Sequence, residues 1–421
     1  MSSYRSRGRA RASYSSFGSH TPGNLPGDKD ILGGLSSSPL QTILKLSTYS
    51  SDQEVKITDF QYVGSYNWID KPTPTIIVPG SPRRWTNRAP PYQVHADDGL
   101  SFKDQNGYRC PNSVLLPLIT AVNRVSAPNE EKFDWASIDF VTDRNNFRKL
   151  LRWISGSAND FRIDVQLAGK TILLNRWENR YKEQMSGRTY GFNFEEASTR
   201  PAPGCENSTG HHRIVRYNMN GLKLVVRFEV DACVSVVSPT HPQSTVSSSG
   251  DDLDGIIGAL SGVSLRTESA APPPSIKATG GLETFPTITV ISGGCVVPQS
   301  SIIELTTRSM HNASAFEWKE SYPQLFFSQT PHHFLAVHER GLFKQVNKRK
   351  LESSELKMVA QTIQEDLKKL RRLLDQITEL VKKHGERGRL SFVCQNGELK
   401  VYERTNRASC LPDEVLQLFK S

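Results

Sequence analysis

The stretch from Asn220 to Asp231 constrains the fold of this chain more than any other segment. Asn220-Gly221 is a strong signal for a two-residue hairpin turn, and the alternating residues that follow it are typical of a strand. Successive strand side chains point to opposite faces, so Glu229 and Asp231 share the face opposite the apolar one. Two neighbouring acids repel each other unless a positive partner lies between them. A divalent metal ion is one such partner, and a solvated strand face is the alternative.

Two other segments place an acid on a predicted strand. Residues 191–195 alternate in the same way and put Glu195 opposite two phenylalanines, and residues 301–308 form a short apolar strand that reaches Glu304. If these strands neighbour the first, four carboxylates come together. Such a cluster is a usual way to hold two metal ions about 3.5–4 Å apart for phosphodiester hydrolysis.

The order of these motifs resembles that of the DXO-type decapping exoribonucleases, which are RNA 5′-end quality-control enzymes. The family pattern is an arginine, then Gly-Φ-x-Φ-Glu, Glu-Φ-Asp and Glu-Φ-Lys, where Φ is apolar. The matching residues here are Arg144, Gly191 to Glu195, Glu229 to Asp231, and Glu304 with Leu305. Gln324 lies in a segment similar to the family's glutamine-containing helix, and the resemblance runs from about Tyr62 to the C-terminus.

The resemblance implies an α/β (α+β) fold with a mixed, strand-rich core similar to that of the PD-(D/E)XK nucleases and flanked by helices. It also implies roles for the matched residues. Glu195, Glu229, Asp231 and Glu304 would be catalytic and would hold one or two Mg²⁺ or Mn²⁺ ions, with the Leu305 carbonyl as a further ligand. Arg144 and Gln324 would bind the RNA at its 5′ phosphate or first nucleotide.

The chain departs from the family pattern at one position. Thr306 stands where the family has the motif lysine, which positions the attacking water and stabilises charge in the transition state. Losing one stabiliser of that kind costs on the order of 100–1,000-fold in rate. Arg308 faces the same side of the strand, but its planar guanidinium is a poor substitute for an ammonium group.

Two functions therefore remain open. The first is a metal-dependent RNA 5′-end hydrolase that removes incomplete caps or 5′ phosphates and acts as a 5′–3′ exonuclease, weakened by Thr306. The second is an inactive protein that binds RNA 5′ ends and partners a nuclear 5′–3′ exoribonuclease. The four retained acids favour the hydrolase, because a chain that had abandoned catalysis would have little need of a metal site.

Composition agrees with an RNA-associated protein. The formal net charge of +9 favours acidic partners, nucleic acid first, through contacts to phosphates. The six cysteines lie far apart without paired spacing, which argues against a zinc site or a disulfide scaffold and fits a reducing compartment. No apolar run approaches the roughly 18 residues of a membrane span, so we expect no membrane partner.

The chain divides into a tail and one domain. Residues 1–50 are rich in arginine, serine and glycine, and we expect them to be disordered. Their arginines favour a nuclear protein, with a cytoplasmic location or a mitochondrial transit segment as the alternatives. Residues 51–421 are predicted to form a single decapping-nuclease-like domain with a low-complexity insertion at about 238–277.

Periodicity outlines the remaining elements. Strands are predicted over 161–167, 171–174, 334–337, 390–394 and 399–403, and helices over 147–154, over 354–384 and from Pro412. The pairs His211-His212 and His332-His333 lie on presumed strands, where neighbours point to opposite faces. We interpret both pairs as structural, with His212 or His332 lining an RNA path as the alternative.

Overall fold

The computed structural model describes residues 25, 27–47, 53–127, 132–185, 187–234 and 287–420. The predicted insertion at 238–277 and most of the predicted tail lie outside these residues. Residues 27–47, however, belong to the folded domain, because β1 (Gln41–Ile43) pairs with the strand β20 (Glu398–Glu403) near the C-terminus. The expected disorder of residues 1–50 is therefore wrong for this part of the segment.

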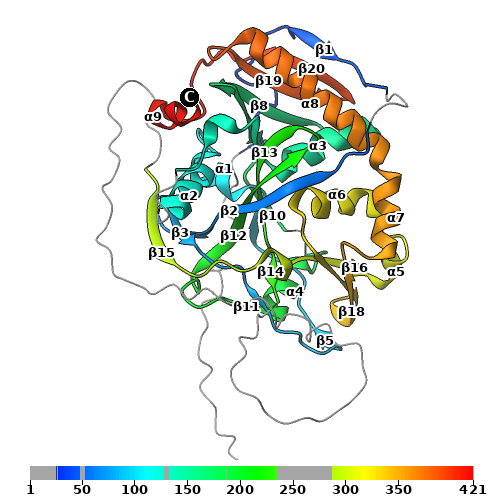
Figure 1. Cartoon of the computed structure of the whole chain (residues 1–421). Helices are drawn as coiled ribbons and strands as arrows, with labels where there is room; N and C mark the ends of the chain where they lie inside the picture. Colours follow the sequence, from blue (N-terminus) through cyan, green and yellow to red (C-terminus); the bar gives the residue numbers. More distant parts are fainter. Residues whose placement is uncertain are drawn as a thin grey trace, which may run out of the picture.

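Two mixed sheets organise the described residues (Figure 1). The larger sheet has eleven strands in the order β1-β20-β19-β8-β9-β7-β13-β12-β2-β3-β15. Besides β1 and β20, these are β2 (Ile57–Ile69), β3 (Thr75–Pro79), β7 (Phe140–Asp143), β8 (Phe161–Ala168), β9 (Thr171–Trp177), β12 (Ser208–Met219), β13 (Leu222–Glu229), β15 (Thr289–Gly293) and β19 (Arg389–Gln395). The strand-rich α+β fold predicted from the sequence is confirmed.

The smaller sheet has seven strands in the order β11-β4-β14-β16-β17-β18-β5. Its strands are β4 (Arg84–Trp85), β5 (Tyr92–Gln93), β11 (Thr199–Arg200), β14 (Ala232–Cys233), β16 (Ile302–Ser309), β17 (His332–Glu339) and β18 (Leu342–Lys350). A separate ribbon pairs β6 (Leu100–Phe102) with β10 (Lys182–Gln184). The chain passes from the larger sheet to the smaller one between β13 and β14, so Glu229 and Asp231 lie at the junction of the two sheets.

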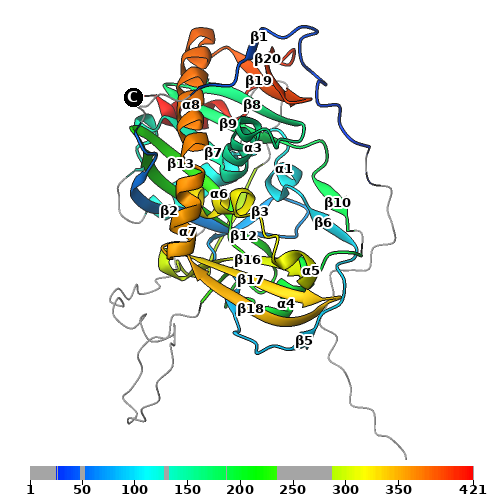
Figure 2. The same cartoon turned by 90° about the vertical axis from the view of Figure 1, so that its right-hand side faces the viewer.

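Helices cover both faces of the larger sheet (Figures 1 and 2). On one face, α3 (Arg144–Ser155), α6 (Trp318–Ser328) and α8 (Gln364–His384) bury apolar side chains in a common core with the sheet. On the other face, α2 (Leu116–Ser126) packs with residues near the C-terminus, beside α9 (Asp413–Leu416). Within the part of the chain that the structure describes, no helix combines the length and apolar character needed to cross a membrane.

Local sequence signals explain much of this architecture. The hairpin between β12 and β13 turns at Asn220 and Gly221, whose φ angles of 46° and 89° are the positive values that this turn requires. The predicted helix over 354–384 is two helices, α7 (Ser354–Thr362) and α8, which meet at Ile363. Ser353 caps the first of them by accepting a hydrogen bond from the Leu356 amide.

Candidate active site

Two of the predicted acids lie at the junction of the sheets. Glu229 is the last residue of β13 and is exposed, whereas Asp231 precedes β14 and is half-buried. The Leu305 amide donates a hydrogen bond of 2.7 Å to Asp231 Oδ2 and so ties this acid to β16. The Asp231 carboxylate is thus held by backbone of the smaller sheet, and Glu229 stands at the end of a strand of the larger one.

The third acid, Glu304, is buried on β16 and has two partners. Arg144 Nη1 lies 2.9 Å from its Oε2, and the Gln324 side-chain amide donates to its Oε1. Arg144 is the first residue of α3 and directly follows β7, and Gln324 comes from α6. The structure therefore brings together Arg144, Glu304 and Gln324, three residues far apart in the sequence.

The fourth acid, Glu195, lies on a helix and not on a strand. Residues 191–198 form α4 (Gly191–Ser198), so the strand predicted for this motif is wrong. The Asp97 carboxylate accepts a hydrogen bond of 2.9 Å from the Asn193 amide and so satisfies one of the free N–H groups at the start of the helix. Of the two phenylalanines in the motif, Phe194 is buried against the aromatic core of the smaller sheet, while Phe192 is exposed.

The four carboxylates lie close enough to act on one another's charge. Burial, and after it the charge of Glu229, raise the pKa of Glu195 to about 8, although Arg83 opposes the shift. Burial followed by Glu304 and Glu195 raises the pKa of Asp231 well above its usual range, against the hydrogen bond from Leu305. The pKa of Glu229 shifts in the same direction, mainly through desolvation by the surrounding protein, although Arg176 and Arg144 oppose it. The cluster therefore holds more negative charge than its neighbouring arginines balance.

The chemistry of this donor set fits a divalent cation. Hard cations such as Mg²⁺ bind carboxylate oxygens, and an added positive charge would relieve the repulsion that raises these pKa values. Within the described ranges, no three His, Cys, Asp or Glu side chains are spaced to enclose a metal ion as they stand. At Glu304, Arg144 and Gln324 contact the two carboxylate oxygens.

The position of the missing lysine is occupied by a neutral pair. Thr306 Oγ1 lies 3.1 Å from His333 Nε2. Burial lowers the pKa of His333 to about 4, and Glu304 opposes the shift. Arg308 does not replace the lysine, because its guanidinium lies 5.2 Å from the ring centre of Phe316 and donates to the Thr307 carbonyl.

His333 lies at this site, although the sequence analysis interpreted it, together with His332, as structural. Its parallel register with Glu304 across β16 and β17 places it there, whereas the sequence showed only an adjacent histidine pair. Of the histidines considered for an RNA path, His212 is buried beside Tyr66, with ring centres 5.1 Å apart, and His332 Nε2 lies 2.9 Å from the Ser300 carbonyl oxygen. These contacts are structural.

Comparison with solved structures identifies the fold. Rai1 of S. pombe in complex with 3′-FADP is 12% identical, with a TM-score of 0.52 over 83% of this chain and 94% of that one. Rai1 of Scheffersomyces stipitis in complex with (3′-NADP)⁺ and calcium is 12% identical, with a TM-score of 0.56 over 90% and 99%. Dxo1 of K. lactis in complex with manganese is 9% identical, with a TM-score of 0.50 over 87% and 96%.

These TM-scores, over most of each chain, establish a shared fold and confirm at that level the resemblance to the DXO-type proteins. A search of curated protein sequences finds no match. One family model matches residues 41–419, which is most of the chain. The protein accordingly belongs to the family described as Domain of unknown function (DUF8563).

Proposed function

We propose that this protein binds the 5′ ends of RNA and hydrolyses them with the help of divalent metal ions. The observation that carries the proposal is the convergence of four carboxylates with Arg144 and Gln324 on a fold shared with Rai1 and Dxo1. One neighbour of this fold, Candida albicans Rai1, was solved in complex with pU5-Mn²⁺, at 12% identity and a TM-score of 0.53. Its ligands are of the kind that the acids and the arginine here would bind.

Each site residue has a role in this proposal. Glu195, Glu229, Asp231 and Glu304, with the Leu305 carbonyl, would hold one or two Mg²⁺ or Mn²⁺ ions. Such ions supply Lewis acidity and charge neutralisation for phosphodiester hydrolysis.

Arg144 and Gln324 would bind the RNA itself. Arg144 contacts protein acceptors through Nη1, and no other nitrogen of its guanidinium has a hydrogen bond within the described residues. Its remaining N–H groups can therefore bind a phosphate oxygen. Gln324 donates a hydrogen bond to Glu304, and in this proposal it would contact the same phosphate or the first nucleotide.

A second function is supported by the Thr306–His333 pair. Because no lysine stands there and Arg308 lies over Phe316, the site lacks a cation at that position, which favours a protein that binds RNA 5′ ends without cleaving them. Such a protein would act with a 5′–3′ exoribonuclease. In either case we propose a nuclear location.

The experiment compares wild type with Glu304→Gln on RNAs that carry a 5′ monophosphate, a 5′ triphosphate or an incomplete cap, in Mg²⁺ or Mn²⁺. Release of mononucleotides or a cap fragment by the wild type alone supports the hydrolase. Glu379→Gln, an exposed acid on α8, is the matched control and should retain full activity. Absence of turnover by a wild type that still binds RNA and metal would replace the hydrolase with the binding protein.

A further inference from the structure

Two of the six free cysteines, Cys205 and Cys295, come together in the fold although they are far apart in the sequence. Cys205 lies in the turn between β11 and β12, where its amide donates a hydrogen bond of 3.0 Å to the Ala202 carbonyl. Cys295 follows β15 and leads toward β16, the strand of Glu304. Their spacing in the sequence does not indicate a pair.

The backbones beside the two cysteines are in contact. A Cβ added to Gly204 would lie 3.4 Å from the Gly294 nitrogen, and a Cβ added to Gly293 would lie 3.5 Å from the Gly204 carbonyl oxygen. Gly204 and Gly294 have φ angles of 76° and 68°, in the region that favours glycine. The residues that directly precede Cys205 and Cys295 are therefore neighbours in space.

Ser81 contacts both thiols. Its hydroxyl lies 3.5 Å from Cys295 Sγ and accepts a hydrogen bond of 2.7 Å from the Cys295 amide. Burial raises the pKa of the Cys205 thiol, a hydrogen bond from the Ser81 backbone opposes this shift, and the charges of Glu206 and Cys295 add to it. The two sulfur atoms are thus near enough for their charges to interact.

The two thiols differ in exposure, and the difference suits two successive roles. Cys295 is exposed, whereas Cys205 is 2% exposed and packs against Ile77 and Ala202. An oxidant in solution reaches an exposed thiol first, and a neighbouring thiol can then attack the oxidised sulfur.

A third cysteine, Cys233, also lies near Cys295. Burial raises the pKa of the Cys233 thiol to about 11, Arg84 opposes the shift, and Cys295 adds to it. Cys233 is held in β14, whose backbone pairs with both β4 and β16. Cys205 lies in a turn beside a glycine and has more freedom to reach the geometry that a disulfide requires, so it is the better partner.

We propose that Cys205 and Cys295 are a site of oxidative modification, which forms a reversible disulfide when the protein meets hydrogen peroxide. In the first step the Cys295 sulfur attacks one peroxide oxygen, the O–O bond breaks, and a sulfenic acid and water form. In the second step the Cys205 sulfur attacks the Cys295 sulfur, the S–O bond breaks, and water leaves with the thiol proton. The two sulfurs lose two electrons in all, and the peroxide gains them. A dithiol reverses the change by thiol–disulfide exchange.

The bond would join two connections between the sheets. Cys205 lies between β11 of the smaller sheet and β12 of the larger one, and Cys295 lies between β15 of the larger sheet and β16 of the smaller one (Figure 1). A transient bond of this kind is compatible with a reducing compartment, where the disulfides that do form are usually short-lived. Neither cysteine belongs to the carboxylate site, so the proposal does not rest on the proposed function.

The test treats the whole protein with hydrogen peroxide, alkylates the remaining thiols in denaturant and maps linked peptides by mass spectrometry. The expected result is a peptide pair joined through Cys205 and Cys295, absent before treatment and lost after reduction with dithiothreitol. In Cys205→Ser, Cys295 should instead accumulate as a sulfenic acid that dimedone traps. In Cys295→Ser, Cys205 should stay reduced.

The matched control is Cys394→Ser, which removes a buried thiol from β19 and should form the bond as the wild type does. Cys295→Ser changes an exposed residue, so it decides the question if Cys205→Ser does not fold. Full alkylation of Cys205 after treatment of the wild type would overturn the proposal. A bond from Cys295 to Cys233, or to a second molecule, would overturn it as well.

Discussion

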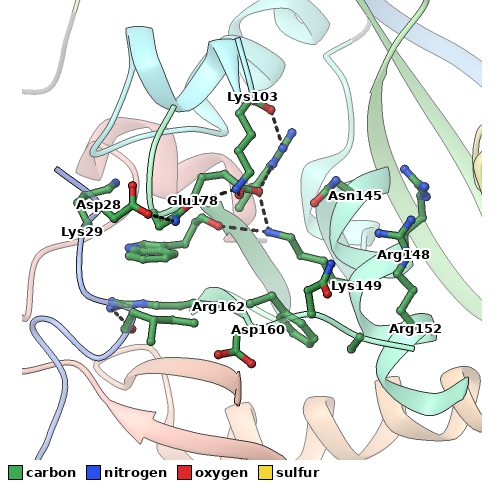
Figure 3. A pocket seen from close by; sticks show the side chains of 17 residues that line it. Asp28, Lys29, Lys103, Asn145, Arg148, Lys149, Arg152, Asp160, Arg162 and Glu178 are labelled. Carbon is green, nitrogen blue, oxygen red and sulfur yellow. Dashed lines mark hydrogen bonds and ion pairs between the residues drawn. The ribbon is translucent and has the colours of Figure 1, made fainter. Parts of the chain in front are cut away.

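Two successive turns of α3 meet surroundings of opposite charge. Arg144, at its start, lies 2.9 Å from Glu304, and the neighbouring acids Glu195, Glu229 and Asp231 have raised pKa values. Arg148, one turn later, lines a basic pocket where seven cations outnumber three acids (Figure 3). An excess of one sign is tolerated when a ligand of the other sign resolves it, so the first region is suited to a metal ion. In the second region, ion pairs such as Lys149 with Glu178 and Arg152 with Glu320 already balance most of the cations.

The largest expected effect concerns the missing lysine. Thr306→Lys should raise the hydrolysis rate on the order of 100- to 1,000-fold, because it restores a cation beside the reacting phosphate. The measurement is single-turnover cleavage of 5′-phosphorylated RNA in Mn²⁺. Thr306→Met, which adds similar length without charge, is the control, and an equal rate in both variants would show that charge at this position does not limit the reaction.

The ion pairs of Arg144 and Arg152, near the two ends of α3, should contribute differently to the free energy of unfolding. Arg144→Gln leaves the buried Glu304 without its cation and should lower the free energy of unfolding by about 3 kcal/mol. Arg152→Gln breaks a pair whose side chains are 37% and 34% exposed and should cost less than about 1 kcal/mol. Equal losses in urea titrations of the two variants would contradict this distinction.

Glu178, in the basic pocket, should stabilise the protein above acidic pH. Burial opposes ionisation of Glu178, but Lys149 and Arg176 lower its pKa from 4.5 to about 2. A lowered folded-state pKa gives stability that is present above pH 4.5 and lost as the pH falls toward 2. Glu178→Gln should therefore lower the free energy of unfolding by about 3 kcal/mol at pH 7 and reduce the further loss of stability between pH 4.5 and 2. Unfolding titrations at several pH values, with Glu379→Gln as the control, measure both the loss at pH 7 and its dependence on pH.

Glu195, in the acidic cluster, should have the opposite effect on how stability changes with pH. Its pKa is raised from 4.5 to about 8, so in metal-free buffer the folded state binds the extra proton between these values. The free energy of unfolding should then fall as the pH rises from about 5 to 8, by about 1–2 kcal/mol after solvent screening at this half-buried group. Glu195→Gln should remove its share of that slope, and an unchanged slope in this variant would assign it to Asp231 and Glu229, whose pKa values are also raised.

Features that depend on neighbouring residues were predictable. Asn220-Gly221 fixed the hairpin because the turn needs two residues with positive φ. The helix over 147–154 and the strands over 161–167 and 390–394 match α3, β8 and β19, because helical spacing and short runs of strand-forming residues are signals carried by neighbouring residues.

Features that depend on contacts between distant residues were not predictable from the sequence. Residues 191–195 alternate like a strand, yet Asp97 supplies the hydrogen bond that starts α4. Residues 28–31 line the pocket beside α3 because the N-terminal segment pairs with β20. No pattern within residues 28–31 predicts this position. His333 joins the site only through its register with Glu304 across two strands.

A crystal structure with Mn²⁺ and a 5′-phosphorylated oligouridine bound to wild type and to Glu304→Gln tests the proposed metal site. Manganese should give anomalous density among Glu195, Glu229, Asp231 and Glu304 in the wild type, and weaker density in the variant. The 5′ phosphate should lie at Arg144. Manganese bound elsewhere, or RNA on another face while the four carboxylates remain without metal, would rule out metal-dependent hydrolysis at these residues.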